Sequence, residues 1–485
     1  MSPSTSVSHA RRWWTLGVLS LAQLMVALDA TVINIALPRA QIDLGFSSAN
    51  RQWLITAYAL AFGSLMLLGG RLSDLWGRRA ALLLGIAGFA GASALGGAAH
   101  SFTMLVSARA VQGVFGALLA PAALAALTVT FTNPKERAKA FSIYGAVGGS
   151  GAAIGLLLGG ALTQWASWRW CLYINLVFAL IAFAGVVLFV AGGKSEHHSS
   201  LDVLGTVLAS GGLFFIVYGL GHAVTSSWSN AATWGSLAIG AVLLVAFFAW
   251  QRRSEHPLLP LRIFASRTRS GSLVAIFFTS LGMFGVSLFL AYYLQSTLGY
   301  SPLRTGFAFL PLVLAISVSA ALASARLLAK TGPRPLVPTG MVLAMMGMVL
   351  FTRLAPHSNY FTAVLPGLVV LGLGLGLIFA PAIASATAQV EVADAGAASA
   401  LVNTTQQIGG SVGTALLNTI AVSVTLRAIA HAGSSSTHAV TTATLHGYAV
   451  AFWWAAGLFG FGAVLTFVLL ESGPQVADDS VPVLV

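Results

Sequence analysis

The sequence predicts an all-α integral membrane protein, and three observations lead to this fold class. Of its 485 residues, 57% are hydrophobic and only 7% are charged, whereas a soluble globular domain carries about 25% charged residues. Apolar stretches recur from one end of the chain to the other, and each has the roughly 20 residues that a helix needs to cross a bilayer. The 52 glycines fit the same class, because helices in lipid pack closely through small residues.

Fourteen apolar stretches are expected to cross the membrane. The first follows Arg11 and Arg12 and begins like a signal sequence, but it is too long for an h-region and has no clear cleavage site, so we interpret it as a retained helix. The expected spans are 13–37, 53–70, 80–99, 102–129, 138–162, 170–191, 203–221, 232–250, 272–295, 306–328, 336–354, 361–386, 397–426 and 448–470.

The formal charge of +12 is explained by membrane orientation and not by a nucleic-acid partner. Seventeen of the 24 Lys and Arg residues fall in segments on the side of the N-terminus, six fall on the opposite side, and Arg109 lies inside a span. Because positive residues are retained in the cytoplasm, both termini are expected to be cytoplasmic.

The chain is expected to consist of two related halves. The charged connections 192–202 and 251–270 flank spans seven and eight, which we interpret as an inserted pair. Three short motifs recur between the remaining halves at offsets of 255, 260 and 261 residues: 70–79 with 325–334, 116–122 with 376–382, and 147–150 with 408–411. Such internal repeats are typical of alternating-access transporters.

These boundaries predict five segments. They are a cytoplasmic tail (1–12), a first six-helix bundle (13–191), linkers with the inserted helices (192–270), a second six-helix bundle (271–470) and a cytoplasmic tail (471–485).

Asp29 and Arg109 are the candidates for proton coupling. Asp29 is the acidic residue that lies well inside a span, ten residues from Arg39, and Arg109 lies eight residues from Ser101. At 1.5 Å per residue the two lie about 15 and 12 Å below the same surface, so they can meet. Ionisable groups at such depth are usually paired and functional; a static ion pair, or an Asp29 satisfied by a nearby Thr or Asn, is the structural alternative.

Polar and aromatic residues on several spans are candidates for the substrate cavity. Gln112 shares a helix face with Arg109, while Asn403 and Gln407 form a stripe at helical spacing. The stripe fits interhelical hydrogen bonding equally well, and tyrosines near a helix end also occur in the interfacial belt. The candidates are Asn34, Gln112, Tyr292, Tyr293, Asn403 and Gln407.

Two glycine-containing segments have a predicted mechanical role. On the fifth span, Gly151, Gly155 and Gly159 recur at helical spacing and form a packing ridge. The turn after the second span is a candidate conformational gate, in which glycines permit close approach and the arginines also serve as ordinary cytoplasmic anchors. Its residues are Gly70, Asp74, Gly77, Arg78 and Arg79.

No pattern in the sequence indicates an enzyme or a bound cofactor. The glycine-rich run 372–376 falls inside a span and not after a strand, and no Walker lysine motif is present, so ATP is not expected to drive the protein. The single cysteine, Cys171, rules out an intrachain disulfide, and the histidines have no metal-ligand spacing.

Four stretches resemble signatures of the fourteen-span drug:proton antiporters (EmrB/QacA type) of the major facilitator superfamily, and the similarity covers essentially the whole chain. They are Leu28-Asp-Ala-Thr-Val-Ile-Asn-Ile-Ala-Leu-Pro38, Gly70-Arg-Leu-Ser-Asp-Leu-Trp-Gly-Arg-Arg79, Leu105-Val-Ser-Ala-Arg-Ala-Val-Gln-Gly-Val-Phe-Gly116 and Gly151-Ala-Ala-Ile-Gly-Leu-Leu-Leu-Gly-Gly160. In the third, the family's arginine is associated with proton transfer, and Arg109 occupies that position.

The resemblance implies a monomeric exporter in the bacterial inner membrane. It would exchange protons for hydrophobic, in some cases cationic, small organic molecules, with the lipid bilayer and no nucleic acid as its other partner. This chain has Leu156 where the family's antiporter signature has proline, which leaves proton-coupled uptake as an alternative. A non-transporting membrane sensor or a lipid enzyme would need a soluble domain or a polar catalytic cluster, and the sequence shows neither.

The orientation gives a first testable expectation. Cysteines introduced near Lys135 and Arg262 should react with a membrane-impermeant maleimide only from the cytoplasmic side, and cysteines near Ser227 and Ser434 only from outside. Labelling of either pair from the other side in intact cells and inverted vesicles would refute the fourteen-span arrangement.

Overall fold

The computed structural model describes residues 9–131, 133–190, 202–225, 229–254, 257–259, 261–323, 327–388, 395–432 and 436–473. In these ranges the chain is helical and has no strand. The helices are α1 (His9–Leu44), α2 (Trp53–Trp76), α3 (Arg78–Gly97), α4 (Phe102–Thr130), α5 (Pro134–Trp165), α6 (Trp170–Phe189), α7 (Val203–Thr225), α8 (Ala231–Gln251), η1 (Leu261–Ala265), α9 (Arg267–Tyr292), η2 (Tyr293–Thr297), α10 (Pro302–Leu322), α11 (Leu328–Thr331), α12 (Pro333–Phe351), η4 (Tyr360–Val364), α13 (Leu365–Thr387), α14 (Ala395–Ala432) and α15 (Thr437–Leu469).

Among the described residues, 12 helical segments are long and apolar enough to cross a membrane. Helices α2 and α5 fall outside that count, because their apolar segments in the described residues are the shorter Trp53–Met66 and Ala153–Trp165, although α2 has 24 residues and α5 has 32. An all-helical membrane protein is therefore confirmed, as the composition predicted, because a helix satisfies its own backbone hydrogen bonds in lipid.

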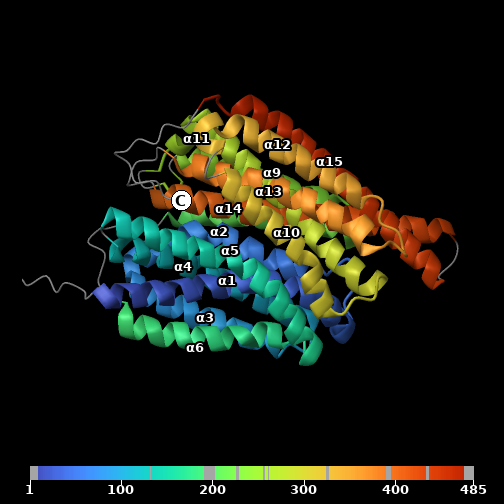
Figure 1. Cartoon of the computed structure of the whole chain (residues 1–485), viewed down its shortest axis with the longest axis horizontal. Coiled ribbons are helices and arrows are strands. Elements are labelled where there is room, and N and C mark those ends of the chain that lie inside the picture. The colour runs from blue at the N-terminus through green and yellow to red at the C-terminus, as the bar shows by residue number, and fades with distance from the viewer. Residues whose placement is uncertain are drawn as a thin grey trace, which may run out of the picture.

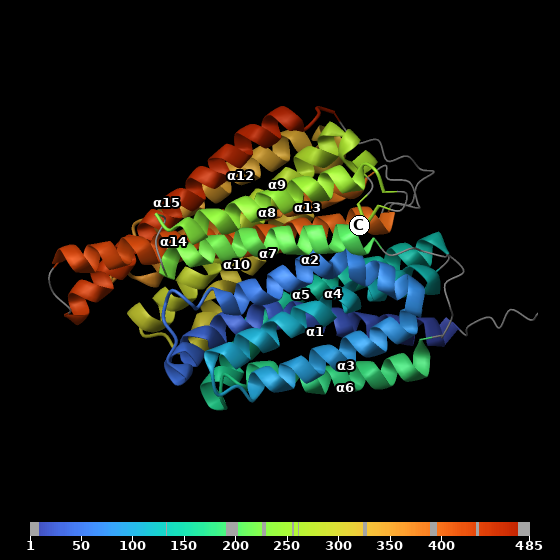
Figure 2. The same ribbon diagram turned by 180° about the vertical axis from the view of Figure 1, so that it is seen from behind.

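The helices form two groups that run side by side (Figure 1). Helices α1 to α6 contact one another, and α9, α10 and α12 to α15 contact one another. We call the boundary between the two groups the seam. The pair α7–α8 lies along it, and α7 contacts both α2 and α14. Figure 2 shows this pair in front of the two groups. We call the end that carries the start of α1 and the end of α15 the terminal end, and the opposite end the distal end.

Some boundaries differ from those expected. Helix α15 begins at Thr437 and not at Tyr448, because the Ser436 hydroxyl accepts a hydrogen bond from the Ala439 amide and so caps the helix 11 residues earlier. As a result α14 and α15 extend past the other helices at the distal end (Figure 1). The tail expected at 1–12 is already helical from His9.

Asp202 fixes the start of the α7–α8 pair. It accepts hydrogen bonds from the Gly205 amide (2.8 Å), the Trp250 indole (2.7 Å) and the Gln251 amide (2.6 Å). Burial raises the pKa of Asp202, but these hydrogen bonds outweigh burial and hold the pKa below its ordinary value. The carboxylate thereby joins the N-terminus of α7 to the C-terminus of α8.

The two groups are joined by hydrogen bonds in the distal half of the molecule. Side-chain hydrogen bonds that join α1–α6 (with their connections) to α9–α15 there include Gln295 to the Ile35 carbonyl (3.0 Å) and the Leu303 amide to Gln164 (3.3 Å). Helices α5 and α10 also meet closely, because a Cβ on Gly306 would lie 2.5 Å from the Leu156 carbonyl oxygen. Figure 2 shows the groups diverging toward the terminal end.

Substituting Gly306→Ala should open the distal end. The added methyl group meets backbone, which cannot turn aside, so α10 must move away from α5. Spin labels at the exposed positions Trp165 and Arg304 should report a longer and broader distance by electron paramagnetic resonance. Gly145→Ala on α5 is the matched control, because a Cβ there meets nothing within 4 Å; an unchanged distance in Gly306→Ala would contradict this packing.

Candidate functional site

The predicted pairing of Asp29 with Arg109 is confirmed. Arg109 on α4 places its Nη1 atom 2.5 Å from Asp29 Oδ2 on α1, and each side chain is only 1% exposed. The two side chains can meet because they lie at similar distances from the same end of the bundle, Asp29 on α1 and Arg109 on α4. At this degree of burial, a carboxylate and a guanidinium must compensate each other's charge.

Three further residues complete the environment of the carboxylate. Asp29 Oδ1 accepts hydrogen bonds from Asn175 on α6 (2.8 Å) and from Gln112 on α4 (3.1 Å). Ser93 on α3 accepts from the same two amides, at 3.3 and 2.6 Å. With three N–H groups directed at its two oxygens, the site matches an ionised Asp29, because an ionised carboxylate only accepts hydrogen bonds.

Helix α2 supplies further partners of the guanidinium. Arg109 Nε donates to the Leu54 carbonyl oxygen (3.1 Å), and the Tyr58 ring lies 4.4 Å from Arg109 Cζ. Such a close approach of α2 to α4 depends on Gly113, where a Cβ would lie 2.4 Å from the Tyr58 carbonyl oxygen. The site therefore touches five helices: α1, α2, α3, α4 and α6.

The residues predicted for a substrate cavity do not all lie together. Gln112 is fully buried and belongs to the Asp29 site, because its amide is used by Asp29, Ser93 and Arg109. Tyr293 donates to the Ala355 carbonyl oxygen (2.8 Å) within the second group of helices. Tyr292 instead points across the seam to Gln41 (2.5 Å). The two neighbouring tyrosines diverge where α9 gives way to the π-helical turn η2.

The amide residues lie on helices at or near the seam. Asn403 and Gln407 are half-buried on α14, and a Cβ on Gly63 of α2 would lie 2.7 Å from Gln407 Cβ. Asn34 is half-buried on α1, and its Oδ1 atom has no hydrogen-bond partner among the described residues.

The expected glycine ridge lies against α1. A Cβ would lie 2.7 Å from Ala27 Cβ at Gly151, 2.0 Å from Thr31 Oγ1 at Gly155 and 3.1 Å from the Val32 backbone at Gly159. This stretch of α1 includes Asp29, so the glycines let α5 lie directly behind the carboxylate-bearing helix.

In the gate segment, Gly77 separates α2 from α3 with a left-handed φ of 87°, a conformation that favours glycine. Arg79 donates to the Val187 carbonyl oxygen near the end of α6 (2.7 Å), while Arg78 begins α3. A Cβ on Gly70 would make only an ordinary van der Waals contact with its neighbours. The close approach of α2 to α4 occurs at Gly69 instead, where a Cβ would lie 2.1 Å from the Ala117 carbonyl oxygen. Asp74 lies on α2, but its side chain is outside the described part of the structure.

Comparison with known proteins identifies the family. A protein-family model described as Major Facilitator Superfamily matches residues 19–414. The chain belongs to the major facilitator superfamily. It is accordingly a membrane transporter and not an enzyme, as the sequence predicted. A bacterial homologue of the human lysosomal transporter Spinster, solved in an inward-facing and occupied conformation, superposes with a TM-score of 0.70 over 95% of this chain and 97% of that one at 17% identity, which shows the same fold.

Two relatives are named for antibiotic resistance. The chain is 49% identical to the puromycin resistance protein pur8 of Streptomyces alboniger, over 97% of this chain and 93% of the relative. It is 34% identical to the tetracenomycin C resistance and export protein of Streptomyces glaucescens, over 86% of this chain and 77% of the relative.

Sequence reasoning missed several members of the site. Ser93, Asn175 and Tyr58 lie in otherwise apolar spans, and the polarity of Ser93 and Asn175 was the one available signal. Arg51 was counted among the outer loop charges, but it is 3% exposed. Nothing in the local sequence distinguishes it from a solvated arginine.

A double-mutant cycle tests the coupling of the pair. Arg109→Ala should lower the thermal stability in detergent, because it leaves a buried carboxylate uncompensated, at a cost on the order of 3–5 kcal/mol. Adding Asp29→Asn should restore part of that loss. Strictly additive melting-temperature changes would mean that the two side chains do not interact energetically.

Proposed function

We propose that the protein is a proton-driven exporter of small organic molecules. Two relatives with antibiotic resistance or export in their names support efflux, and the 49% identity to a puromycin resistance protein makes puromycin the first substrate to test. The buried Asp29 carries the proposal of proton coupling. Its carboxylate is enclosed by N–H donors, so adding a proton removes the charge on which these contacts are centred.

We further propose how the chain sits in the membrane. The bias of Lys and Arg toward one side supports a cytoplasmic terminal end in a bacterial inner membrane. The lengths of α2 and α5 support fourteen crossings, arranged as two six-helix bundles with the inserted pair α7–α8. The distal hydrogen bonds support an inward-facing state, and we propose that the protein works as a monomer.

Movement of α1 would link proton binding to substrate access. Asp29 is 2% exposed, so exchange of its proton with water requires the surrounding helices to move. On the same helix, the Ile35 carbonyl accepts the distal hydrogen bond from Gln295, about 9 Å from Asp29 along the axis. Protonation removes the charge that pairs with Arg109, and α1 transmits the change to the distal contacts.

Substrate is proposed to meet the polar side chains at the seam. These are Asn34 on α1 and Asn403 and Gln407 on α14, with the Gly70–Arg79 turn acting as the gate at the terminal end and the ridge of Gly151, Gly155 and Gly159 letting α5 slide on α1. Gln112 and Tyr293 have other partners and are assigned to structural contacts.

Transport into inverted vesicles tests the function and its direction. With an acidic interior, an exporter that exchanges protons takes up radiolabelled puromycin, whereas a proton symporter does not. Asp29→Asn should abolish the gradient-dependent uptake, because the side chain can no longer bind and release a proton. Asp43→Asn is the matched control, since Asp43 also lies on α1 but is 46% exposed and pairs with Arg169. Full gradient-driven uptake by Asp29→Asn would overturn the proton-carrier role.

A further inference from the structure

A cavity of about 640 Å³ lies at the distal end, between the two groups of helices. The end of α1, the α1–α2 connection and the first turn before α2 form one side, and α9, α14 and α15 form the other. Its size falls in the range of ligand pockets, about 300–1,000 Å³. Most of its wall is apolar, with a few polar groups among them: Gln41, Ser48, Tyr292, Thr425, Thr444 and Tyr448.

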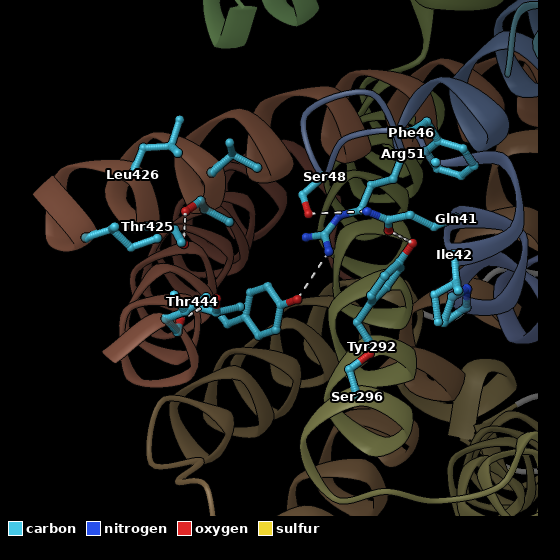
Figure 3. Close-up of a pocket in the computed structure, with 17 residues that line it drawn as sticks. Gln41, Ile42, Phe46, Ser48, Arg51, Tyr292, Ser296, Thr425, Leu426 and Thr444 are labelled. Atoms are coloured by element: carbon cyan, nitrogen blue, oxygen red, sulfur yellow. Dashed lines mark hydrogen bonds between the residues drawn. The ribbon is translucent and has the colours of Figure 1, made fainter. Parts of the chain in front are cut away.

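Among the described residues that line this cavity, Arg51 is the one that carries a charge. Its Nε donates to Asn418 (2.9 Å) and its Nη1 donates to Tyr448 (3.2 Å), so both partners are neutral. Its Cζ lies 4.4 Å from the centre of the Tyr292 ring, and Figure 3 shows the guanidinium beside this ring. Phe289 and Tyr448 provide two further rings, at 5.7 and 5.6 Å. Rings and neutral acceptors stabilise a cation but leave its charge uncompensated.

Carboxylates are scarce at this end of the molecule. Of the 12 acidic residues, only Asp43 falls in the distal part of the expected arrangement, against six arginines. Asp43 already pairs with Arg169 and accepts a hydrogen bond from Trp168. An anion that reaches the cavity would therefore meet a buried positive charge without competition from a carboxylate, in surroundings that strengthen the attraction.

We propose that this distal cavity is a binding site for an organic anion with an apolar body, separate from the Asp29 site. The anionic group would lie against the Arg51 guanidinium, which offers directed N–H donors, and the apolar body would pack on the α14 and α15 side near Thr425 and Thr444. Because the two groups of helices share the wall, an occupied cavity holds the distal end closed. Binding and distal opening then oppose each other reciprocally.

Binding to the purified protein in a neutral detergent tests the site. We expect 1-naphthalenesulfonate to bind by isothermal titration and to raise the melting temperature, with empty micelles subtracted, and the matched cation 1-naphthylmethylammonium to do neither. Arg51→Gln should weaken sulfonate binding about tenfold or more, because a charge-assisted contact is lost. Arg427→Gln is the control for general surface charge, since Arg427 is exposed just beyond the cavity-lining Leu426.

If Arg51→Gln does not fold, a second variant tests whether the anion binds in the distal cavity. Thr444→Phe fills the cavity and keeps Arg51, and the hydrogen bond that Thr444 donates stays within its own helix, to Val440. Loss of sulfonate binding in Thr444→Phe supports the site. Equal binding by the wild type and either variant, equal binding of the ammonium compound, or no sulfonate binding at about 1 mM overturns it. The measurement needs no proton gradient, so its failure is distinct from a failure of export.

Discussion

The buried ion pair of Asp29 and Arg109 is the interaction on which the first group of helices depends. Two charges at this depth are tolerated only if they compensate each other and if their remaining hydrogen-bonding capacity is used. The structure meets both conditions with Gln112, Asn175 and the Leu54 carbonyl. These partners lie on α4, α6 and α2, respectively. The demand of this ion pair for hydrogen-bond donors and acceptors therefore determines how α1, α2, α4 and α6 approach one another.

The second group of helices uses similar packing without a corresponding charge. The motif that places Gly116 on α4 recurs with Gly376 on α13, and a Cβ there would lie 1.9 Å from Ser319 Oγ. At the same offset of 260 residues, Gln112 corresponds to Gly372, and Arg109 corresponds to Val369. Close helix contact through small residues is thus common to the two halves, while the arginine and the glutamine at these positions occur in the first half and are replaced by Val369 and Gly372 in the second.

Contacts across the seam depend on residues that the sequence presents as ordinary. Arg51 reads as one more outer arginine, and Tyr292 and Tyr293 read as neighbouring candidates for a cavity or for the interfacial belt. The fold buries Arg51 among rings of the opposite group, sends Tyr292 across the seam and keeps Tyr293 within its own group. Burial of this kind comes from segments hundreds of residues apart, so helical periodicity carries no signal for it. The early start of α15 has another explanation. Ser436, which caps the helix, is an N-cap residue type that the sequence displays, but the polar residues that follow it led to a later predicted start of the span.

The sequence by itself determined the class of the protein, the positions of its apolar helices and the meeting of Asp29 with Arg109. Each of these follows from a local quantity: hydrophobicity over about 20 residues, or depth along a helix of fixed rise. The tertiary structure alone decided which neutral groups surround the carboxylate, which glycines receive a neighbouring helix and where a cavity remains between the two groups. Those outcomes depend on the rotation and crossing of helices, which small residues permit but do not specify, and only the assembled bundle fixes them.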